Sequence, residues 1–534
     1  MLVTIAPMNT QIQQAFLMLI LFALNQLNSA AQGELLMRGP YLQNGSHTNV
    51  TLRWRTDVAT DSRVRYGTNL THLSFTNDNV AIGTDHVVIL TNLAPDTKYF
   101  YSAGSAVTLL AGEDTNHFFV TSPLPGVAKS TRIWVLGDSG TATAAQVGVR
   151  DAYETFTGTR PTDLWLMLGD NAYESGLDAE YQHGLFDIYT NLFRKSVLWP
   201  TLGNHDTAQA IAFVDTYPYF DIFTLPKNGE AGGVASGTEH YYSFNYANLH
   251  FICLDSMTAG RTINSPMYEW LTNDLAANTA MWTIAYWHHP PYTKGSHDSD
   301  SEIELIEMRQ VFLPVLEQGG VDLVLGGHSH VYERSHLLDQ HYGNSASLAD
   351  SMKLDAGSGR ESETGAYHKH RFNPQAHQGA VYAVVGSSGQ ATGGALNHPA
   401  MHVSLNELGS LVLDINSNRL DAIFLRETGA TNDSFTIVKV NSTTSLRILS
   451  ATLNSSGHCT LTWAAVGGLR YRVSYRDGDP NGAFTDLVQS PVAEINLAPE
   501  GAATMQSFTD NFTLTGGIPT NGARYFRVRV VPWN

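Results

Sequence analysis

The spacing of hydrophobic residues changes twice along this chain of 534 residues and divides it into three regions. From about residue 34 to 123, apolar and polar residues alternate over short stretches. One of them, "VTLRWR", puts Val50, Leu52 and Trp54 on one face. A period of two is typical of strands with one buried face. Because turn signals recur between these stretches, we expect an all-β sandwich in residues 34–123.

The central region, residues 131–430, has a different pattern. Its predicted strands are apolar on both faces and lead directly into polar residues, as in "RIWVLGD", "DLWLMLGD", "MWTIAYWHH" and "VDLVLGGH". Helix-like stretches such as 302–317 lie between several of them. Apolar strands that alternate with helices indicate a largely parallel or mixed sheet covered on both faces, and so an α/β (α+β) domain. Alternation returns in residues 437–534, which predicts a second all-β sandwich.

The first 31 residues are expected to form a signal peptide. The apolar stretch 15–24 is too short to span a bilayer, but it matches the apolar part of a secretory signal. The small residues Ser29, Ala30 and Ala31 fit a cleavage site, although no Lys or Arg precedes Arg38. Since no later segment is long and apolar enough to cross a membrane, we expect a secreted, periplasmic or cell-surface protein without stable membrane insertion.

The charge and the cysteines exclude two further classes. The chain has 31 Lys and Arg against 49 Asp and Glu, a net charge of −18 at pH 7. Binding to a nucleic-acid backbone needs a basic surface, so no nucleic-acid partner is expected. The only cysteines, Cys253 and Cys459, fall in different predicted domains, so we expect free thiols and no disulfide framework.

Five polar motifs follow the predicted strands of the central region. In an open α/β sheet, side chains just beyond the carboxyl ends of the strands converge although they are far apart in sequence. The motifs supply oxygen and imidazole donors without a thiolate, which suits iron, zinc or manganese. They are GDSG (137–140), GDNAY (169–173), GNHD (203–206), HHPPY (288–292) and GHSH (327–330).

The number of donors indicates two ions rather than one. A single catalytic zinc takes three or four protein ligands, and these motifs supply about seven. Two ions about 3.5–4 Å apart can hold the attacking and leaving oxygens of a phosphoryl displacement, provided that one carboxylate bridges them.

Taken singly, each candidate also has a structural interpretation. Asp138 and Asp170 could form turns after their strands, Tyr173 could pack in the core, and Asn204 with His205 could be a helix cap and a surface histidine. His297, in "YTKGSHD", could be a solvated loop residue. The other histidines, including those of "GAYHKHRF" and "NPQAHQG", are interpreted as surface or loop residues, and Trp287 and Tyr292 as packing residues.

The ordered series GDxG, GDxxY, GNH(D/E), a strand-end His before x-Pro, and GHxH resembles the calcineurin-like metallophosphoesterase superfamily. The tyrosine of the second motif makes it similar to the purple acid phosphatase family. The stretch 93–99 ("LAPDTKY") resembles the E–F corner of a fibronectin type III domain, which this family also carries in front of its catalytic domain. The fold class implied is a central metallophosphoesterase sandwich flanked by two all-β sandwich domains.

The resemblance assigns a role to each motif residue. It implies that Asp138, Tyr173 and His330 bind a first metal, usually Fe(III), and that Asp170 bridges to a second, which is Fe(II), Zn or Mn. The second metal's other ligands are implied to be Asn204, His288 and His328, since the H-x-P spacing favours His288 over His289. His205 is implied to contact phosphate and His297 to lie near the leaving group.

The implied activity is hydrolysis of phosphate monoesters on small phosphorylated substrates by a metal-bound hydroxide, active at acidic pH. A phosphodiesterase or nucleotide pyrophosphate hydrolase is the alternative within enzymes, because the same metal site can serve diesters. The Gly/Ser/His-rich insertion 340–378, expected to be a long surface loop, would then set the pocket size. A binding or adhesion protein with a vestigial central domain is the alternative from another class.

Overall fold

The computed structural model describes residues 34–208, 217–369, 374–440, 448–466, 470–479, 482–487, 494–496, 503–519 and 522–531. The predicted signal peptide, residues 1–31, lies outside them. Within these ranges, no helix combines the length and the apolar character needed to cross a membrane.

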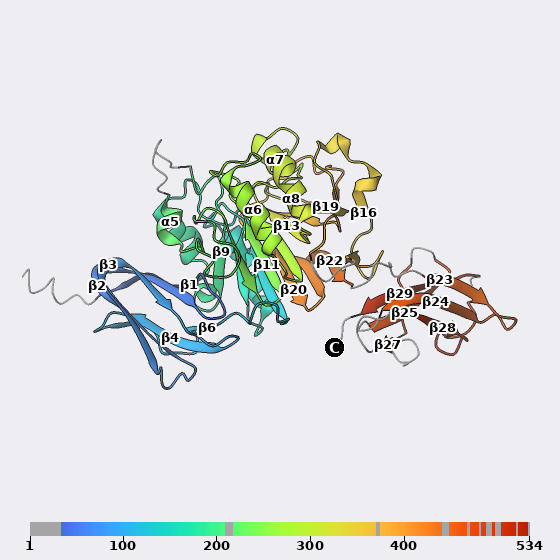
Figure 1. Ribbon diagram of the computed structural model, residues 1–534, viewed down its shortest axis with the longest axis horizontal. Helices are drawn as coiled ribbons and strands as arrows, with labels where there is room; N and C mark the ends of the chain where they lie inside the picture. The colour runs from blue at the N-terminus through green and yellow to red at the C-terminus, as the bar shows by residue number, and fades with distance from the viewer. Residues whose placement is uncertain are drawn as a thin grey trace, which may run out of the picture.

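The N-terminal region is all β, as its alternating pattern predicts, and lies at one end of the molecule (Figure 1). The buried face carries Val50, Leu52 and Trp54, the three residues of the alternating stretch. At the predicted corner, the Tyr99 hydroxyl accepts a hydrogen bond of 3.0 Å from the Ala94 backbone N–H. The strands are β1 (Leu36–Gln43), β2 (Val50–Gly67), β3 (Phe75–Leu90), β4 (Lys98–Gly104), β5 (Leu109–Gly112) and β6 (Phe118–Val120).

The central region contains two sheets of seven strands each. The first has the order β17-β22-β21-β20-β7-β8-β9 and the second β10-β11-β12-β13-β18-β14-β19. The strands of the first are β7 (Thr131–Leu136), β8 (Leu164–Met167), β9 (Val197–Pro200), β17 (Tyr367–Lys369), β20 (Gly409–Asn416), β21 (Arg419–Arg426) and β22 (Thr431–Lys439). Those of the second are β10 (Tyr242–Tyr246), β11 (Leu249–Cys253), β12 (Trp282–Tyr286), β13 (Leu323–Gly326), β14 (Tyr332–Ser335), β18 (Val381–Val385) and β19 (Met401–Leu405).

Helices pack on the sheets, as expected for strands that are apolar on both faces. Tyr153 of helix α2 stacks on Trp134 of β7, with ring centroids 4.2 Å apart. On the other sheet, Leu271 of α6 belongs to the same buried cluster as Ala285 of β12 and Val324 of β13. The helices are α2 (Ala144–Thr157), α3 (Asp178–Tyr181), η1 (Gln182–Phe186), α4 (Thr190–Phe193), α5 (Pro218–Ile222), α6 (Pro266–Ala277), α7 (Ile303–Glu307), η2 (Met308–Phe312) and α8 (Leu313–Gln318).

Strand direction decides where the polar motifs meet. Strands β7, β8 and β9 run parallel in one sheet. In the other, β11, β12, β13 and β18 run parallel. Because all five motifs follow a parallel strand, their side chains leave the sheets at carboxyl ends. The two sheets therefore bring the motifs to one rim.

Two regions differ in detail from the simple pattern. The first sheet of the central region includes β22, which lies at residues 431–439. The central domain therefore extends beyond residue 430, where we expected it to end. The insertion 340–378 is more than a loop, since it carries η3 (Ser345–Ser347), η4 (Asp350–Met352), β16 (Lys353–Asp355) and β17. Strand β16 pairs with β15 (Leu337–Leu338), and β17 pairs with β22.

The C-terminal region returns to β structure in two small sheets, β23-β24-β28 and a sheet centred on β25. Cys459 in β24 and Cys253 in β11 are both free, and Cys253 is buried whereas Cys459 is partly exposed. The strands are β23 (Ile448–Leu453), β24 (Cys459–Val466), β25 (Arg470–Asp477), β26 (Thr485–Asp486), β27 (Glu494–Asn496), β28 (Ala503–Asp510) and β29 (Arg524–Val531).

Candidate metal centre

The turns after the strands hold the candidate ligands in a left-handed backbone conformation. Asp138, Asp170 and His328 have φ values of 55°, 52° and 64°. This conformation costs a non-glycine residue energy and persists where the surroundings demand it, often at functional sites. Next to them, a Cβ on Gly203 would lie 2.1 Å from the Asp170 backbone nitrogen, so only glycine fits there.

One group of side chains surrounds the Asp138 carboxylate. The Tyr173 hydroxyl lies 3.0 Å from Asp170 Oδ2 and 3.5 Å from Asp138 Oδ1. His330 Nε2 lies 3.3 Å from the Tyr173 hydroxyl and 3.6 Å from Asp138 Oδ1. Asp138, Asp170 and His330 thus present ligand atoms within 4.8 Å of one another.

A second group lies on the other side of Asp170. Asn204 Oδ1 is 2.9 Å from His288 Nε2 and 3.0 Å from His328 Nδ1. His288 Nε2 is 3.5 Å from Asp170 Oδ1, whereas the other oxygen of this carboxylate faces Tyr173. Asp170 therefore lies between the two groups, with one oxygen toward each.

The protons of the two histidines are fixed by acceptors outside the group. His288 Nδ1 is 2.8 Å from the Leu168 carbonyl oxygen, which can only accept, so Nδ1 carries the proton. His328 Nε2 is 3.2 Å from Glu302 Oε2 and is protonated for the same reason. Each ring then turns a lone pair toward Asn204 Oδ1. Three acceptors face one another without a hydrogen between them, an arrangement that a cation stabilises.

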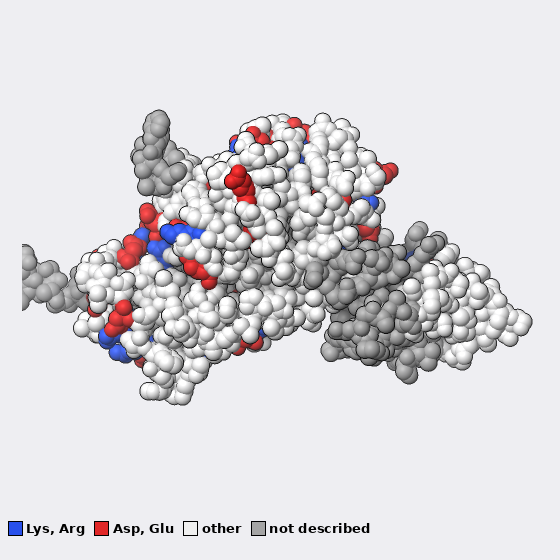
Figure 2. Space-filling view, viewed as in Figure 1, with Lys and Arg blue, Asp and Glu red and all other residues white. Residues whose placement is uncertain are grey.

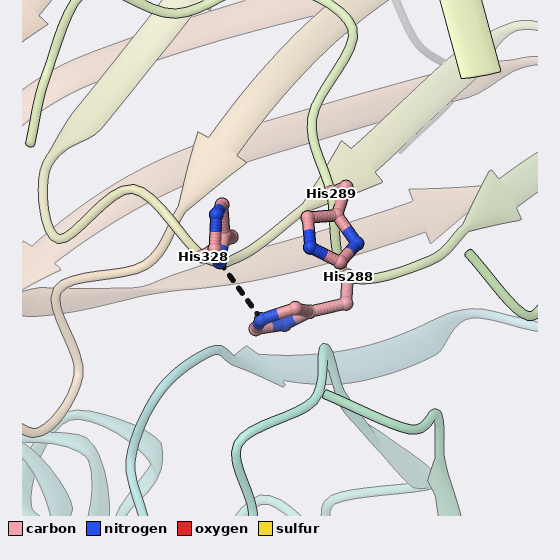
Figure 3. A group of neighbouring side chains, drawn as sticks. All are labelled: His288, His289 and His328. Atoms are coloured by element: carbon pink, nitrogen blue, oxygen red, sulfur yellow. Dashed lines mark hydrogen bonds between the residues drawn. The ribbon is translucent and has the colours of Figure 1, made fainter. Parts of the chain in front are cut away.

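The doublet His288-His289 divides into two different environments (Figure 3). His288 points toward His328, and their facing nitrogens are 3.2 Å apart. His289 instead bonds to the Ser256 hydroxyl through Nδ1 at 2.9 Å, and its ring centroid lies 4.3 Å from that of His328. A ligand atom of His289 also lies within 4.8 Å of those of His288 and His328, but its Nδ1 is bonded to Ser256, so His289 packs beside the second group.

Burial sets the charge of the site. Burial, together with the neighbouring Asp170 carboxylate, raises the pKa of Asp138 well above its usual value. Burial also lowers the pKa of His328 and of His330 to about 4, so both imidazoles are neutral at pH 7. A neutral imidazole is the form in which histidine binds a metal, whereas Asp138 would have to release its proton to bind one, a step that a nearby cation favours.

His205 and His297 both lie at the site. The ring centroid of His205 is 4.3 Å from that of Tyr173, and its Nδ1 is 2.7 Å from the Glu174 carbonyl oxygen. The His297 ring lies 3.7 Å from the His328 ring. His297 Nδ1 is 2.9 Å from Glu302 Oε2, so this carboxylate contacts both His297 and His328.

Two carboxylates of the site were not predicted. Glu302 belongs to none of the five motifs. It lies directly before α7, and its side chain contacts His297 and His328. Asp206 is the last letter of GNHD, and it holds loops together: it accepts hydrogen bonds from the Gly203 and Asn171 backbones and from the Tyr181 hydroxyl. Burial and the Asp170 charge raise the pKa of Asp206 to about 7.

Family models match two parts of the chain. Residues 131–332 match the calcineurin-like phosphoesterase family and residues 38–121 match the purple acid phosphatase N-terminal domain. The chain is therefore similar to the purple acid phosphatase family in its first two regions. The N-terminal match precedes the phosphoesterase match along this chain, the order in which the motif series and the E–F corner predicted the two domains.

Individual relatives agree with this assignment. Purple acid phosphatase 15 of Arabidopsis thaliana is 29% identical over 285 residues, which cover 48% of this chain and 50% of that protein. Purple acid phosphatase 1 of Ipomoea batatas is 29% identical over 312 residues, which cover 55% and 60%. The chain thus spans about half the length of the curated relatives it matches. The solved purple acid phosphatase PPD1 from yellow lupin seeds has a similar fold, with a TM-score of 0.57, 16% identity and 77% of each chain covered.

The family implies a dinuclear metal centre, and the residues fit one. The two groups offer three or more oxygen and nitrogen donors each, and Asp170 has one oxygen for either side. The buried like charges of Asp138 and Asp170 also need a nearby cation, since burying two carboxylates together is costly.

Proposed function

We propose that this protein is a phosphohydrolase that cleaves phosphate monoesters at a dinuclear metal centre. The observation that carries the proposal is the placement of Asp170, whose two oxygens face different groups of donors. The first ion is assigned to Asp138, Tyr173 and His330. The second is assigned to Asn204, His288 and His328, with Asp170 shared.

The chemistry of the donors supports the choice of metals. Tyrosine and two carboxylates are hard oxygen donors, which favours Fe(III) at the first site. The amide oxygen and two imidazoles of the second group suit Fe(II), Zn or Mn. When bound, the ions activate water and neutralise charge on phosphoryl oxygens.

The protein's own side chains then orient and protonate the substrate. The Glu174 carbonyl holds the Nδ1 proton of His205, so His205 presents Nε2 to the site, 4.0 Å from Asp170 Oδ2. His297 is held at the opposite side by Glu302. We assign His205 to binding of the phosphate and His297 to protonation of the leaving oxygen, a step that general acids of this type perform.

The substrate class and the location are proposed from the charge of the chain and from its N-terminal sequence. A small phosphorylated substrate is proposed, and on the face shown in Figure 2 acidic and basic side chains are interspersed. A nucleic-acid substrate is not proposed, because the net charge is −18. Export to the periplasm, the cell surface or the medium is proposed on the apolar stretch 15–24.

Metal content and turnover test the proposal together. We expect two metal ions per chain by mass spectrometry, a tyrosinate–Fe(III) absorbance band, and turnover of p-nitrophenyl phosphate at least about tenfold faster than of bis(p-nitrophenyl) phosphate. Asp138→Asn and His328→Ala should each remove metal and turnover. A metal-free protein without turnover would favour the binding protein, and preferred diester turnover would favour the phosphodiesterase.

A further inference from the structure

We propose that the N-terminal β domain positions the metal centre through an ion pair between Arg38 and Asp178. This ion pair holds the segment that contains Tyr173 and Glu174, and the Glu174 carbonyl oxygen in turn holds His205. This inference rests on the proposed function for its effect on catalysis. The structural link itself is independent of it.

Arg38 of β1 gives nearly all of its hydrogen-bonding capacity to the central domain. Its side chain is 2% exposed, and its two terminal nitrogens bond to the Asp178 carboxylate, each at 3.0 Å. Nη2 also donates to the Asp178 carbonyl oxygen at 3.1 Å, and Nε to Gln182 Oε1 at 2.8 Å. The guanidinium lies 4.6 Å from the centre of the Phe186 ring. A paired, forked contact of this kind fixes orientation as well as distance.

Arg55 of β2 adds a second contact from the same domain. Its Nη1 is 2.6 Å from Asp178 Oδ2, and its Nε is 2.7 Å from Asp85. Burial opposes the charge on Asp178, but the two arginines outweigh it and lower the pKa of this carboxyl. Asp178 therefore stays ionised and bonded to both strands.

From Asp178 the contacts continue to the metal centre within a few residues. Asp178 begins α3, and Glu180 of that helix accepts hydrogen bonds from the backbone N–H groups of Glu174, Ser175 and Leu177 at 2.8–2.9 Å. Glu174 directly follows Tyr173. Its carbonyl oxygen in turn accepts from His205 Nδ1. The N-terminal domain is thus linked by short contacts to a metal ligand and to the phosphate-binding histidine.

The same segment also braces two of the motif loops. The Tyr181 hydroxyl donates to Asp206 Oδ1 at 2.6 Å, which holds the loop of Asn204. A Cβ on Gly184 would lie 2.5 Å from the Gly140 carbonyl oxygen, so η1 packs directly on the loop of Asp138. Mutation of residues that orient the ligands of a metal typically lowers metal affinity or activity about 10- to 100-fold.

Arg38→Met and Asp178→Asn test the link in the full-length protein. Methionine keeps the apolar contact with Phe186, and Asp178→Asn changes a partly exposed residue, so at least one of the two should fold. Arg63→Met is the control, because it breaks an exposed ion pair with Asp78 within the N-terminal domain. Hydrogen exchange of residues 174–186, kcat and KM for p-nitrophenyl phosphate, and the visible band are the readouts.

We expect exchange of residues 174–186 to become at least about tenfold faster in both variants, with kcat/KM about tenfold lower and the band shifted. Arg38→Lys should restore these only in part, since lysine cannot form the forked contact. Exchange and kcat/KM within twofold of the parent in both variants would overturn the inference. If the parent itself hydrolyses no phosphate ester, the proposed function fails, and unchanged or faster exchange still decides the link.

Discussion

His288 Nε2 and His328 Nδ1 lie 3.2 Å apart, and in the neutral rings neither nitrogen carries a proton. Two lone pairs at this distance repel unless something positive lies between them. The rings come from neighbouring parallel strands, β12 and β13, whose carboxyl ends fix the separation. The close approach of these two nitrogens therefore indicates a cation site between the rings.

The histidine doublet gives the sharpest test of ligand identity. His288→Ala should remove one metal ion per chain and lower kcat/KM at least about 100-fold, because it deletes a donor. His289→Asn should keep both ions, since His289 bonds to Ser256 and not to the group, although packing against His328 is lost. Metal analysis of the two purified variants checks this. Equal metal loss in both, or loss only in the second, would contradict the assignment.

The buried carboxylates predict that Asp138→Asn has opposite effects on stability in the absence and in the presence of metal. In chelator-treated protein, burial and Asp170 raise the pKa of Asp138, so its ionised form destabilises the fold at pH 7. Asp138→Asn should then be more stable than the metal-free parent, by roughly 1–3 kcal/mol, but less stable than the metal-loaded parent, because the variant loses the metal. Urea unfolding with and without chelator measures both. A loss of stability in both states would argue against the site.

The lack of space around Gly203 in the third motif, GNHD, predicts a strict need for glycine at this position. Gly203→Ala would push a methyl group into Asp170, whose backbone nitrogen lies 2.1 Å from the new Cβ, so metal content and turnover should fall. Gly148→Ala, on helix α2, meets Glu427 only at 3.6 Å and should raise stability by about 0.5–1 kcal/mol. Metal analysis and urea unfolding of the two variants check this prediction. Equal metal content and equal stability in the two variants would contradict the close approach of Gly203 to Asp170.

Two histidines away from the metal centre, His341 and His398, are buried, although we interpreted them from the sequence as surface or loop residues. They predict a loss of stability in acid. Burial lowers the pKa of His341 to about 4 and of His398 to about 3, and neither nitrogen of His341 has a hydrogen-bond partner among the described residues. A lowered histidine pKa means that the stabilising contribution is complete above about pH 6.5 and is lost as the pH falls toward 4. Nearby Arg309 and Asp300 act in opposite directions on His341.

His341→Gln should therefore lose less stability than the parent between pH 7 and pH 4.5, by roughly 1–3 kcal/mol. Urea unfolding at the two pH values gives the difference. Because parent and variant share the same metal centre, acid release of metal affects both and cancels in the comparison. An identical loss in the two proteins would show that His341 does not titrate in this range.

The fold class and the candidate ligands could both be predicted from the order of residues along the chain. Alternation marked the outer β domains, and apolar strands marked the central sheets. The ligands were readable because each follows a parallel strand within a few residues, so a linear pattern fixes its place at the sheet rim. Local rules of this kind need no knowledge of the partner strand.

Which side chains contact one another could not be predicted in this way. The sharing of Asp170, the turning of His289 toward Ser256, and the contacts of Glu302 and Asp206 depend on how two separate sheets are set against each other. Insertion 340–378 gained strands because it lies beside β15 and β22, and Arg38 reaches Asp178 across a domain boundary. Arg38 and Asp178, for example, are 140 positions apart in the sequence. No periodicity records such contacts, since the packing of side chains chooses between neighbours that the chain alone leaves equivalent.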